Sequence, residues 1–490
     1  MSYYQPSPQR IKLQAIPKTW AGYEHLVVVG QYDSIQSFIE TSSLDLTPAW
    51  SSIKKPEAGE LVSSFCQHEG QSIKVTLAVI TSKCSRMNHP ERPDLVTKQI
   101  RSAAKASERT ALLLCPSDTE HHDPLVIAAC RAFPRYSRKS SEQKRSLVDL
   151  SIYGLSDEQQ IERLNALIDG VSHAAEWVDA PPAEFHVPEF IEAAREIAVR
   201  YNVDIDIFEG EQLLHMGAGG LWGVGMAAKH PPALVVLRGP KSSADAPNMV
   251  WVGKGVVYDT GGLSLKPKGT MNGMKMDMGG AAGVLAAFEV AAAHGVAQDL
   301  CAVLCLAENA IGPEALRNDD IITLYSGKTV EINNTDAEGR LILGDGVAYA
   351  HQHLSPVVIV DMATLTGAQL VATGRSFGAL VCNDAELEEA AVEAGMHSGD
   401  LVHPLPYCPE FFQAEFKSAV ADMKNSVKDR MNAQSSCAGH FVESHLGDYA
   451  GKWLHVDIAG PAFIQDRGTG FGVGLLSSLA YAWQRGELEG

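Results

Sequence analysis

Two short segments of this 490-residue chain concentrate the residue types that can bind a metal ion or stabilise charge. Between Val250 and Gly283, charged side chains are interspersed with nine glycines, and a second group lies in the segment NNTDAEGRL, which starts at Asn333. The charged residues of the two segments on which we focus are Lys254, Asp259, Lys266, Asp277, Asp336, Glu338 and Arg340. Glycines let the backbone turn sharply and approach a ligand closely. Carboxylate oxygens are the ligands that hard divalent cations prefer, so the two segments predict a site for two such cations.

Each of these residues, taken alone, has a simpler structural interpretation. An aspartate at the start of a helix is most often a cap for the free N–H groups of the first turn. An aspartate beside a glycine is most often part of a turn, and a lysine after a strand is usually solvated. Four carboxylates and two lysines that follow apolar strands are harder to explain in this way, because so many charges cannot be buried together without counter-ions. The combination therefore favours the metal site.

The elements that must carry these residues alternate between apolar strands and helices. Strand-like runs in the second part of the chain occur at residues 233–237, 249–252, 300–306, 357–360 and 378–382. Runs with so little polar interruption are typical of parallel strands that helices cover on both faces. In such sheets the ligand lies beyond the carboxyl ends of the strands, where the charged segments follow. The predicted fold class is α/β, with a mostly parallel central sheet flanked by helices.

Local patterns also predict how the first charged segment folds. The strand at 249–252 should end at Gly253, which would put Lys254 and Asp259 on a glycine-rich loop after it. Residues 278–293 are rich in glycine and alanine and polar at a single position, so they predict a buried helix that begins just after Asp277.

The second charged segment has a different pattern. Asp336 and Glu338 are two residues apart, so an extended backbone would direct both side chains to one side, and Arg340 with them. A helical run follows towards His353. We therefore expect an extended segment that presents these three side chains together and leads into a helix.

The first part of the chain indicates a separate α/β unit. It contains strand-like runs at residues 25–29 and 75–80 and a helical stretch at 95–114. The predicted organisation is a smaller N-terminal α/β domain over residues 1–150, a linking helix over 151–175 and a larger domain over 176–490.

The charge of the chain is unevenly distributed between these parts. The formal net charge is −19, and residues 1–170 hold 20 basic and 19 acidic side chains, so the acidic excess lies in residues 171–490. An acidic chain lacks the basic surface that releases counter-ions from a phosphate backbone, which argues against nucleic acid as the main ligand. The asymmetry suggests two units with different roles.

Cysteine usage and the terminal segment bear on the cellular compartment. Nine cysteines are spread thinly and form no C-x-x-C pair, which favours reduced thiols over a disulfide framework. The first 20 residues lack the apolar core of a signal peptide. The uncharged stretch 212–228 contains five glycines and predicts loops and turns, not a membrane span. We therefore expect a cytoplasmic protein without a membrane segment.

Longer blocks of sequence carry a more specific resemblance. The segments VGKGVVYDTGGLSLK, MDMGGAAG and NNTDAEGRL resemble the signature blocks of the leucine aminopeptidase (cytosol aminopeptidase) family. The resemblance continues through ATLTGA at residues 363–368 and HVDIAGPAF at 455–463, and it covers most of residues 175–490. It implies a smaller, variable N-terminal domain and a larger catalytic domain. The first 170 residues carry no comparable signature.

The resemblance implies an activity and an assembly. Members of the family are two-zinc metallopeptidases that remove the N-terminal residue of a peptide, with leucine or a similar residue preferred, by means of a metal-activated water. The family forms hexamers, so the same assembly is expected here, with peptides that have a free N-terminus as substrates.

The resemblance also implies a role for each matching position. The metal ligands would be Lys254, Asp259, Asp277, Asp336 and Glu338. Of these, Asp259 and Glu338 would bridge both ions, Lys254 and Asp277 would complete the tighter site, and Asp336 would complete the more exchangeable one. Zn²⁺ is the expected ion, with Mn²⁺ or Mg²⁺ possible at the exchangeable site.

Two further functions are implied by position. Lys266 would stabilise the developing oxyanion, and Arg340 would hold a bicarbonate ion that acts as the general base.

The pocket for the N-terminal side chain would be formed by Met274, Thr364, Leu365, Gly367 and Ala459. The chain departs from the family at 361–362, where Asp-Met replaces the Asn-Ala of many members.

One alternative function remains open from the sequence. Some relatives of this family bind DNA, so the chain could be a DNA-binding regulatory protein on an aminopeptidase scaffold. The stretch 135–145, with five basic residues and one glutamate, is the basic run that could serve this role. The net charge of residues 1–170 is only +1, so we expect that nucleic acid is not a partner.

Overall fold

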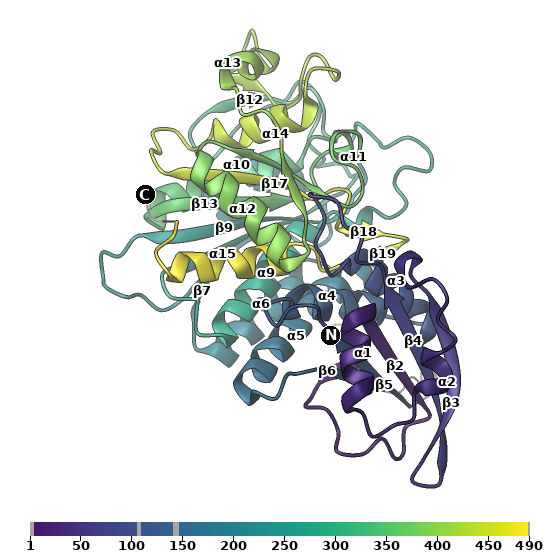
Figure 1. Ribbon diagram of the computed structural model, residues 1–490. Coiled ribbons are helices and arrows are strands. Elements are labelled where there is room, and N and C mark those ends of the chain that lie inside the picture. Colours follow the sequence, from purple (N-terminus) through teal and green to yellow (C-terminus); the bar gives the residue numbers. More distant parts are fainter. Residues whose placement is uncertain (1–3, 105–108, 141–146, 489–490) are drawn as a thin grey trace. The chain divides into compact units, whose positions relative to one another are not determined.

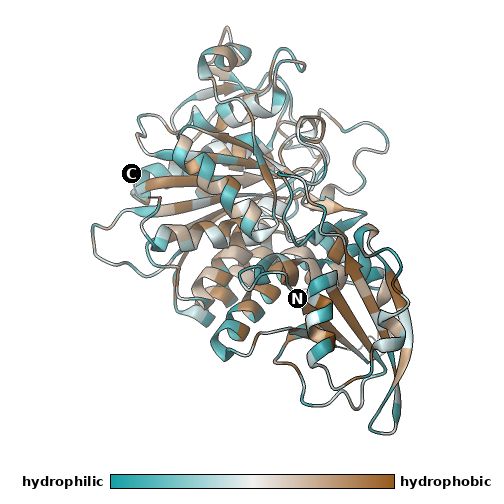
Figure 2. Cartoon of the chain, in the orientation of Figure 1, coloured by the Kyte–Doolittle hydropathy of each residue, from teal (hydrophilic) through white to brown (hydrophobic). Residues whose placement is uncertain are grey.

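The structure is a computed structural model of the chain, and it describes residues 4–104, 109–140 and 147–488. It has the predicted mixed α/β architecture and divides into two compact units (Figure 1). The N-terminal unit comprises Pro6–Ser172 together with Met396–Gly399, and the C-terminal unit contains the remaining residues. In Figure 2 the central strands of both sheets are predominantly hydrophobic, as expected for strands buried between helices.

The N-terminal unit is built on a six-stranded sheet in the order β1-β6-β5-β2-β4-β3. Its strands are β1 (Ile11–Leu13), β2 (His25–Gln31), β3 (Leu61–His68), β4 (Gln71–Ile80), β5 (Thr110–Cys115) and β6 (Val148–Ile152). Only β3 and β4 pair antiparallel among the neighbours in this sheet. Its helices are α1 (Tyr32–Thr41), α2 (Thr47–Trp50), α3 (Pro93–Ala103) and α4 (His122–Ala132).

Two sequence expectations for this unit are wrong in part. The helix predicted over 95–114 ends at Ala103, because the apolar run that begins at Thr110 is strand β5, which lies fully buried between β2 and β6. The linking helix begins later than predicted, since β6 extends to Ile152 and α5 spans Glu158–Asp179. Asp157 precedes α5, and its carboxylate accepts the N–H of Gln159, as an N-terminal cap does.

The basic stretch 135–145 can be described only in part, because residues 141–146 lie outside the described residues. Arg135 is buried, and its guanidinium donates a hydrogen bond to the carbonyl oxygen of Ser7 at 2.7 Å. This arginine therefore supports the fold of the unit and does not contribute an exposed charge.

The C-terminal unit contains an eight-stranded sheet in the order β15-β14-β17-β13-β9-β10-β8-β7. Its strands are β7 (Asp204–Glu209), β8 (Ala233–Arg238), β9 (Asn248–Asp259), β10 (Leu300–Asn309), β13 (Pro356–Ala363), β14 (Gly378–Cys382), β15 (Val402–Pro404) and β17 (Lys452–Asp457). The four central strands β17, β13, β9 and β10 are parallel, as predicted. Their carboxyl ends therefore meet at one edge of the sheet.

Smaller elements and helices complete this unit. Short strands are β11 (Ile321–Thr323), β12 (Thr329–Glu331), β16 (Met423–Lys424), β18 (Phe463–Ile464) and β19 (Arg467–Gly468). The helices are α6 (Val187–Tyr201), α7 (Glu211–Met216), α8 (Gly219–Gly225), α9 (Gly279–Ala293), α10 (Gly339–His353), α11 (Gly367–Ala372), α12 (Ala385–Ser398), α13 (Pro409–Phe412), α14 (Gln434–Glu443) and α15 (Val473–Gln484). A short 3-10 turn, η3 (Met274–Met276), precedes α9.

Helix α9 is the buried helix that the sequence predicts, with each residue from Gly279 to Ala291 inside the fold. Within the described residues, the stretch Met274–Ala293 is long and apolar enough to cross a membrane, but 83% of its apolar window is buried in the fold. Burial of this kind is what a core helix shows.

Helices α9 and α10 cover opposite faces of strand β9. A side chain on Gly253 would meet the Ala281 backbone of α9 at 2.6 Å, whereas a side chain on Gly346 of α10 would meet Val252. Since adjacent strand residues point to opposite faces, the two helices must lie on either side of the sheet. Both helices begin at the carboxyl edge of β9, where the charged segments converge.

The strand end predicted at Gly253 is wrong, because β9 continues to Asp259. Lys254 and Asp259 therefore lie on the strand itself. Gly253 and Gly255 are strand residues whose missing side chains make room for α9: a Cβ on Gly255 would lie 3.1 Å from the Cβ of Ala281. The glycines that indicated a loop instead allow close packing between strand and helix.

The stretch 212–228 differs from its prediction in a similar way. It forms the helices α7 and α8, not loops. Gly220 lies on α8, where a Cβ would come within 2.5 Å of the carbonyl oxygen of Leu341, so this glycine permits a close contact between α8 and α10.

Close packing of α9 against the sheet leads to a first prediction. A Cβ on Gly280 would overlap the carbonyl oxygen of Met362, a backbone atom that cannot rotate away. Gly280→Ala should therefore displace α9 and reduce the free energy of unfolding by about 1–3 kcal/mol, visible as a lower melting temperature in calorimetry. Gly223→Ala on α8 is the matched control, because its Cβ would make only ordinary contacts with Leu316. Equal melting temperatures for the two variants would contradict the packing argument.

Candidate metal centre and substrate cavity

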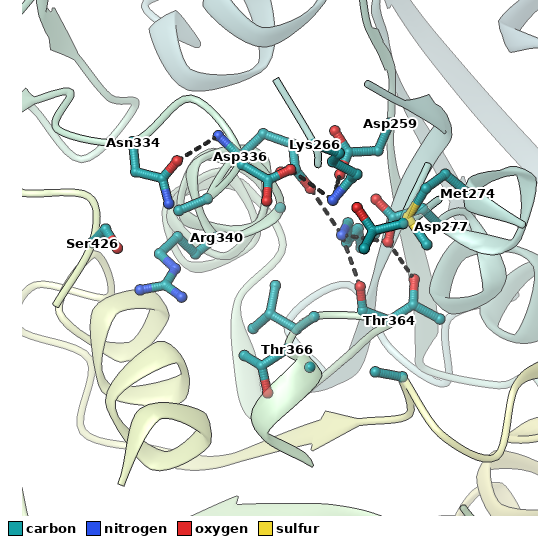
Figure 3. Close-up of a pocket in the computed structure, with 18 of the residues that line it drawn as sticks. Asp259, Lys266, Met274, Asp277, Asn334, Asp336, Arg340, Thr364, Thr366 and Ser426 are labelled. Carbon is teal, nitrogen blue, oxygen red and sulfur yellow. Dashed lines mark hydrogen bonds and ion pairs between the residues drawn. The ribbon is translucent and has the colours of Figure 1, made fainter. Parts of the chain in front are cut away.

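A cavity of about 520 Å³ lies at the carboxyl edge of the central strands (Figure 3). It brings together all twelve residues that sequence analysis assigned to a site. These are Lys254, Asp259, Lys266, Met274, Asp277, Asp336, Glu338, Arg340, Thr364, Leu365, Gly367 and Ala459. They come from β9, η3, the start of α10 and the segments that follow β13 and β17.

One cluster in the cavity is centred on Lys254, which is almost fully buried. Its Nζ donates to Asp277 Oδ1 at 2.7 Å and to the carbonyl oxygen of Thr364 at 2.8 Å, and it lies 2.9 Å from Glu338 Oε1. Although burial disfavours the ammonium form, the carboxylates of Asp277 and Glu338 raise the pKa of Lys254 above its ordinary value. The pKa values of Asp277 and Glu338 are also raised, in their case because burial disfavours the charged carboxylate.

A second cluster is centred on Lys266, on the loop after β9. Its Nζ lies 2.6 Å from Asp259 Oδ2 and 2.6 Å from Asp336 Oδ1 (Figure 3). The other oxygen of Asp259 accepts hydrogen bonds from the Gly261 N–H and from Asn309 Nδ2, both at 2.8 Å. These bonds fix the Asp259 carboxylate and leave its Oδ2 directed into the cavity.

The donor set fits a divalent metal centre. Ligand oxygens of Asp259, Asp336 and Glu338 all lie within 4.8 Å of one another. Asp277 Oδ2 and Glu338 Oε2 are buried and have no hydrogen-bond partner among the described residues. Buried carboxylate oxygens without a partner are costly, and a hard cation supplies the missing interaction. The ammonium groups of Lys254 and Lys266 lie beside these carboxylates and supply positive charge to the cluster.

The extended conformation predicted for the second charged segment is wrong, although its three side chains do line one cavity. Asn334 Oδ1 accepts the N–H of Asp336 at 3.0 Å, which folds the segment into a turn. Glu338 has helical backbone angles and occupies the N-cap position of α10, and Arg340 lies in the first turn of that helix. The side chains converge because they surround the start of a helix.

Arg340 is buried beside the carboxylates and retains an unused donor. Its Nη1 donates to the carbonyl oxygen of Asn425 at 3.1 Å, while its Nε has no hydrogen-bond partner among the described residues. Burial lowers the pKa of Arg340 to about 10, against the opposing effect of Glu338. A cationic group with a free donor in a cavity can bind a small anion.

The remaining wall of the cavity is less polar. Met274 projects from η3, and the segment after β13 contributes Thr364, Leu365 and Gly367. Ala459 follows β17 and completes this wall. In Figure 3, Met274 and Asp277 lie on one side of the cavity, and Arg340 and Ser426 lie on the other. The cavity can therefore receive an apolar side chain next to the metal centre.

Sequence analysis missed other residues of the cavity. They include Thr270, Asn334, Thr366, Leu370, Ser426, Arg430 and Gln434. Asn334 and Thr366 lie in the quoted blocks NNTDAEGRL and ATLTGA, which could have indicated them, whereas the other five belong to no recognisable motif. Asn309 does not line the cavity but holds the Asp259 carboxylate, and it could have been found as a polar residue shortly after the predicted strand 300–306.

Comparison with known proteins identifies the family. The family model described as "Cytosol aminopeptidase family, catalytic domain" matches residues 172–477, which is more than half of the chain. The chain belongs to the cytosol aminopeptidase family. A second model, "M17 aminopeptidase N-terminal domain 2", matches residues 24–142, so the N-terminal unit also resembles this family although its sequence carries no obvious signature.

Individual relatives agree with this assignment. The chain is 48% identical over 417 residues to a probable aminopeptidase of Mus musculus, NPEPL1, covering 82% of this chain and 79% of that protein. Its fold matches a leucyl aminopeptidase from Leishmania major in complex with actinonin, with a TM-score of 0.90 and 33% identity, over 97% of this chain and 95% of that one. It also resembles the bottromycin maturation enzyme BotP in complex with Mn, with a TM-score of 0.78 and 26% identity, over 94% and 100% of the two chains.

Membership of the cytosol aminopeptidase family gives the class of reaction. The protein is an aminopeptidase, a metal-dependent hydrolase that removes the N-terminal residue from peptides. The buried carboxylate cluster is the part of the cavity suited to hold the divalent metal.

Proposed function

We propose that the protein is a leucyl-type aminopeptidase whose cavity binds two divalent ions through Lys254, Asp259, Asp277, Asp336 and Glu338. The observation that carries this proposal is the convergence of these five donors, with two buried carboxylate oxygens that have no hydrogen-bond partner in the described part of the chain. Asp259 and Glu338 would contact both ions, Lys254 and Asp277 the tighter one, and Asp336 the more exchangeable one. Lys254 would bind through its neutral amine.

Zn²⁺ is the proposed ion for both positions, with Mn²⁺ or Mg²⁺ as an alternative at the exchangeable one. A carboxylate-rich donor set accepts all three ions. The Mn complex of BotP supports manganese as an alternative. When bound, the two ions would supply a water activated at neutral pH, a contact for the free α-amine and polarisation of the scissile carbonyl.

Two cationic side chains of the cavity have proposed catalytic roles. The ammonium of Lys266, held between Asp259 and Asp336, would stabilise negative charge that develops on the carbonyl oxygen. Arg340 would hold a bicarbonate ion through its unused Nε, and that ion would supply a general base. Both side chains are held in position by their contacts in the cavity wall, so they need little rearrangement during the reaction.

The pocket for the N-terminal side chain is proposed to consist of Met274, Thr364, Leu365, Gly367 and Ala459. Their small or apolar character favours leucine, methionine and similar residues. The discrimination per methylene in such a pocket is about 1–3 kcal/mol. A clear preference for leucine over alanine is therefore expected, and only a modest one between leucine and methionine.

A panel of aminoacyl-amides assayed with defined metals tests this proposal. Metal-stripped protein should regain Leu-amide hydrolysis on addition of Zn²⁺ or Mn²⁺, with saturation at two equivalents per chain by elemental analysis. N-acetyl-Leu-amide should resist hydrolysis, because it lacks the free amine. Full activity after exhaustive chelation, or equal hydrolysis of the acetylated substrate, would overturn the proposal.

Assembly and location are proposed on the basis of family resemblance. We propose a homohexamer, for which light scattering on the purified protein is the direct measurement, and a monomer would contradict it.

Several curated relatives are named "Probable cytosol aminopeptidase", which supports a cytoplasmic location. Peptides with a free N-terminus are the proposed partners, and no role for nucleic acid is proposed.

A further inference from the structure

Asp457 is a buried carboxylate at the end of β17 whose contacts converge on one wall of the cavity. Its Oδ1 accepts the N–H groups of Leu365 at 3.1 Å, Thr366 at 3.4 Å and Ala459 at 3.2 Å. Its Oδ2 accepts the hydroxyl of Thr366 at 2.6 Å. The side chain does not itself line the cavity, but each of the residues it contacts does.

These contacts tie together two segments that are distant in sequence. Leu365 and Thr366 follow β13, whereas Ala459 follows β17, and Asp457 is bonded to both. The hydroxyl of Thr366 also connects these segments to α11, because it caps that helix by accepting the N–H of Gln369 at 3.1 Å. The distance between the segment after β13 and the segment after β17 sets the width of this wall of the cavity.

A carboxylate suits this position better than an amide. The three N–H groups that surround Oδ1 can only donate, so the group they surround must accept. Charge-assisted bonds of this kind are roughly twice as strong as neutral ones, which offsets the cost of burying the charge. An asparagine would lose the charge, and its N–H₂ group cannot accept the Thr366 hydroxyl as Oδ2 does, so the two segments would be held less tightly.

We propose that Asp457 is a positioning residue that fixes the width of the pocket for the N-terminal side chain and thereby sets the preference for leucine over smaller residues. The inference rests on the proposed function, in which Leu365 and Ala459 form part of that pocket. A loosened wall would reduce contact with a leucine side chain that fills the pocket. An alanine side chain reaches less of the wall and would be affected less.

The test compares Asp457→Asn with a matched variant elsewhere in the same unit. Asp400 is equally buried, and its Oδ2 accepts three backbone N–H groups, from Gly472, Gly474 and Leu475, at 3.0–3.3 Å. It does not line the cavity, so Asp400→Asn removes the same kind of charge without touching the pocket. The readout is the ratio of kcat/KM for Leu-amide to kcat/KM for Ala-amide, with metal content and melting temperature measured in parallel.

Asp457→Asn should lower this ratio by about tenfold, mainly through a higher KM for Leu-amide, with two metal ions retained. Asp400→Asn should leave the ratio within about twofold of the parent, even if it melts earlier. An unchanged ratio in Asp457→Asn, a parallel loss for both substrates, or a loss of metal would overturn the proposal. Failure of the parent protein to hydrolyse either amide would instead refute the proposed function.

A second pair of variants covers the case in which Asp457→Asn does not fold. Thr366→Val removes the hydroxyl that Asp457 Oδ2 accepts, while Thr366→Ser keeps it. The valine variant should show the lower Leu-to-Ala ratio and the serine variant should retain the parent ratio. Equal ratios in the two variants would count against the role of Asp457.

Discussion

Glu338→Gln should lower kcat/KM for Leu-amide by about 10³-fold and reduce the bound metal to below two ions per chain. Glu338 lies at the start of α10, with one oxygen beside Lys254 and the other buried and without a hydrogen-bond partner among the residues that the structure describes. Glutamine keeps the size of the side chain but removes the negative charge that a cation requires. Steady-state kinetics and elemental analysis on the same preparation give both quantities.

A matched control separates the loss of the metal from a general effect of the substitution. Glu331→Gln changes the same residue type on β12, outside the cavity, where Glu331 pairs with Lys424 at 3.1 Å. It should retain two ions and activity within about twofold of the parent, because surface ion pairs contribute little. If Glu338→Gln retained both its metal and its activity, the proposed ligand set would be wrong.

Lys266→Met should reduce kcat for Leu-amide by about 10²–10³-fold while KM changes little. The methionine has a similar length but no charge, so it cannot stabilise negative charge on the carbonyl oxygen. Because Lys266 also faces Asp259 and Asp336, its removal leaves these carboxylates more dependent on bound cations. The protein assayed should therefore be saturated with metal, and its metal content should be measured.

Lys268→Met provides the comparison for this variant. Lys268 is exposed on the same loop and does not line the cavity, so its replacement should leave kcat within about twofold of the parent. An unchanged kcat in Lys266→Met would contradict a catalytic role. A fall in kcat that tracks a loss of metal would mean that Lys266 acts by holding the ligands and not by contact with the substrate.

Much of the fold was predictable because it depends on local hydrophobic pattern. The strand-like runs at 233–237, 300–306 and 378–382 correspond to β8, β10 and β14, since uninterrupted apolar segments of this length have few alternatives to a buried strand. The charged residues of the cavity were predictable as a group, because four carboxylates and two lysines that follow buried strands cannot be buried together without counter-ions. Their roles came from the resemblance to the family, not from the pattern.

Two physical causes account for the predictions that failed, namely packing against distant segments and local side-chain bonds to the backbone. The glycines at 253 and 255 indicate a loop by residue type, yet both lie within β9. Glycine is required there because α9 occupies the space that larger side chains would take. The segment that contains Asp336 is turned and not extended for a local reason, because the Asn334 side chain accepts the N–H of Asp336 two residues later. Asp457 lies in the quoted block HVDIAGPAF, but its contacts could not be predicted, since its partners at 365 and 366 are more than 90 residues away in sequence. Contacts of this range are absent from any local pattern.

The close approach of glycine backbones to the metal-binding side chains has a consequence for judging related sequences. A Cβ on Gly339 would lie 2.6 Å from Lys254 Cε, so a larger residue there would push a proposed ligand out of line although position 339 offers no ligand itself. Gly253 and Gly280 touch no ligand, but they permit the close approach of α9 to the sheet, since a Cβ there would meet the backbone of Ala281 or of Met362. A relative could thus keep all five ligands and still be inactive. Inspection of these three positions would reveal such pseudoenzymes where a search for the ligands alone would not.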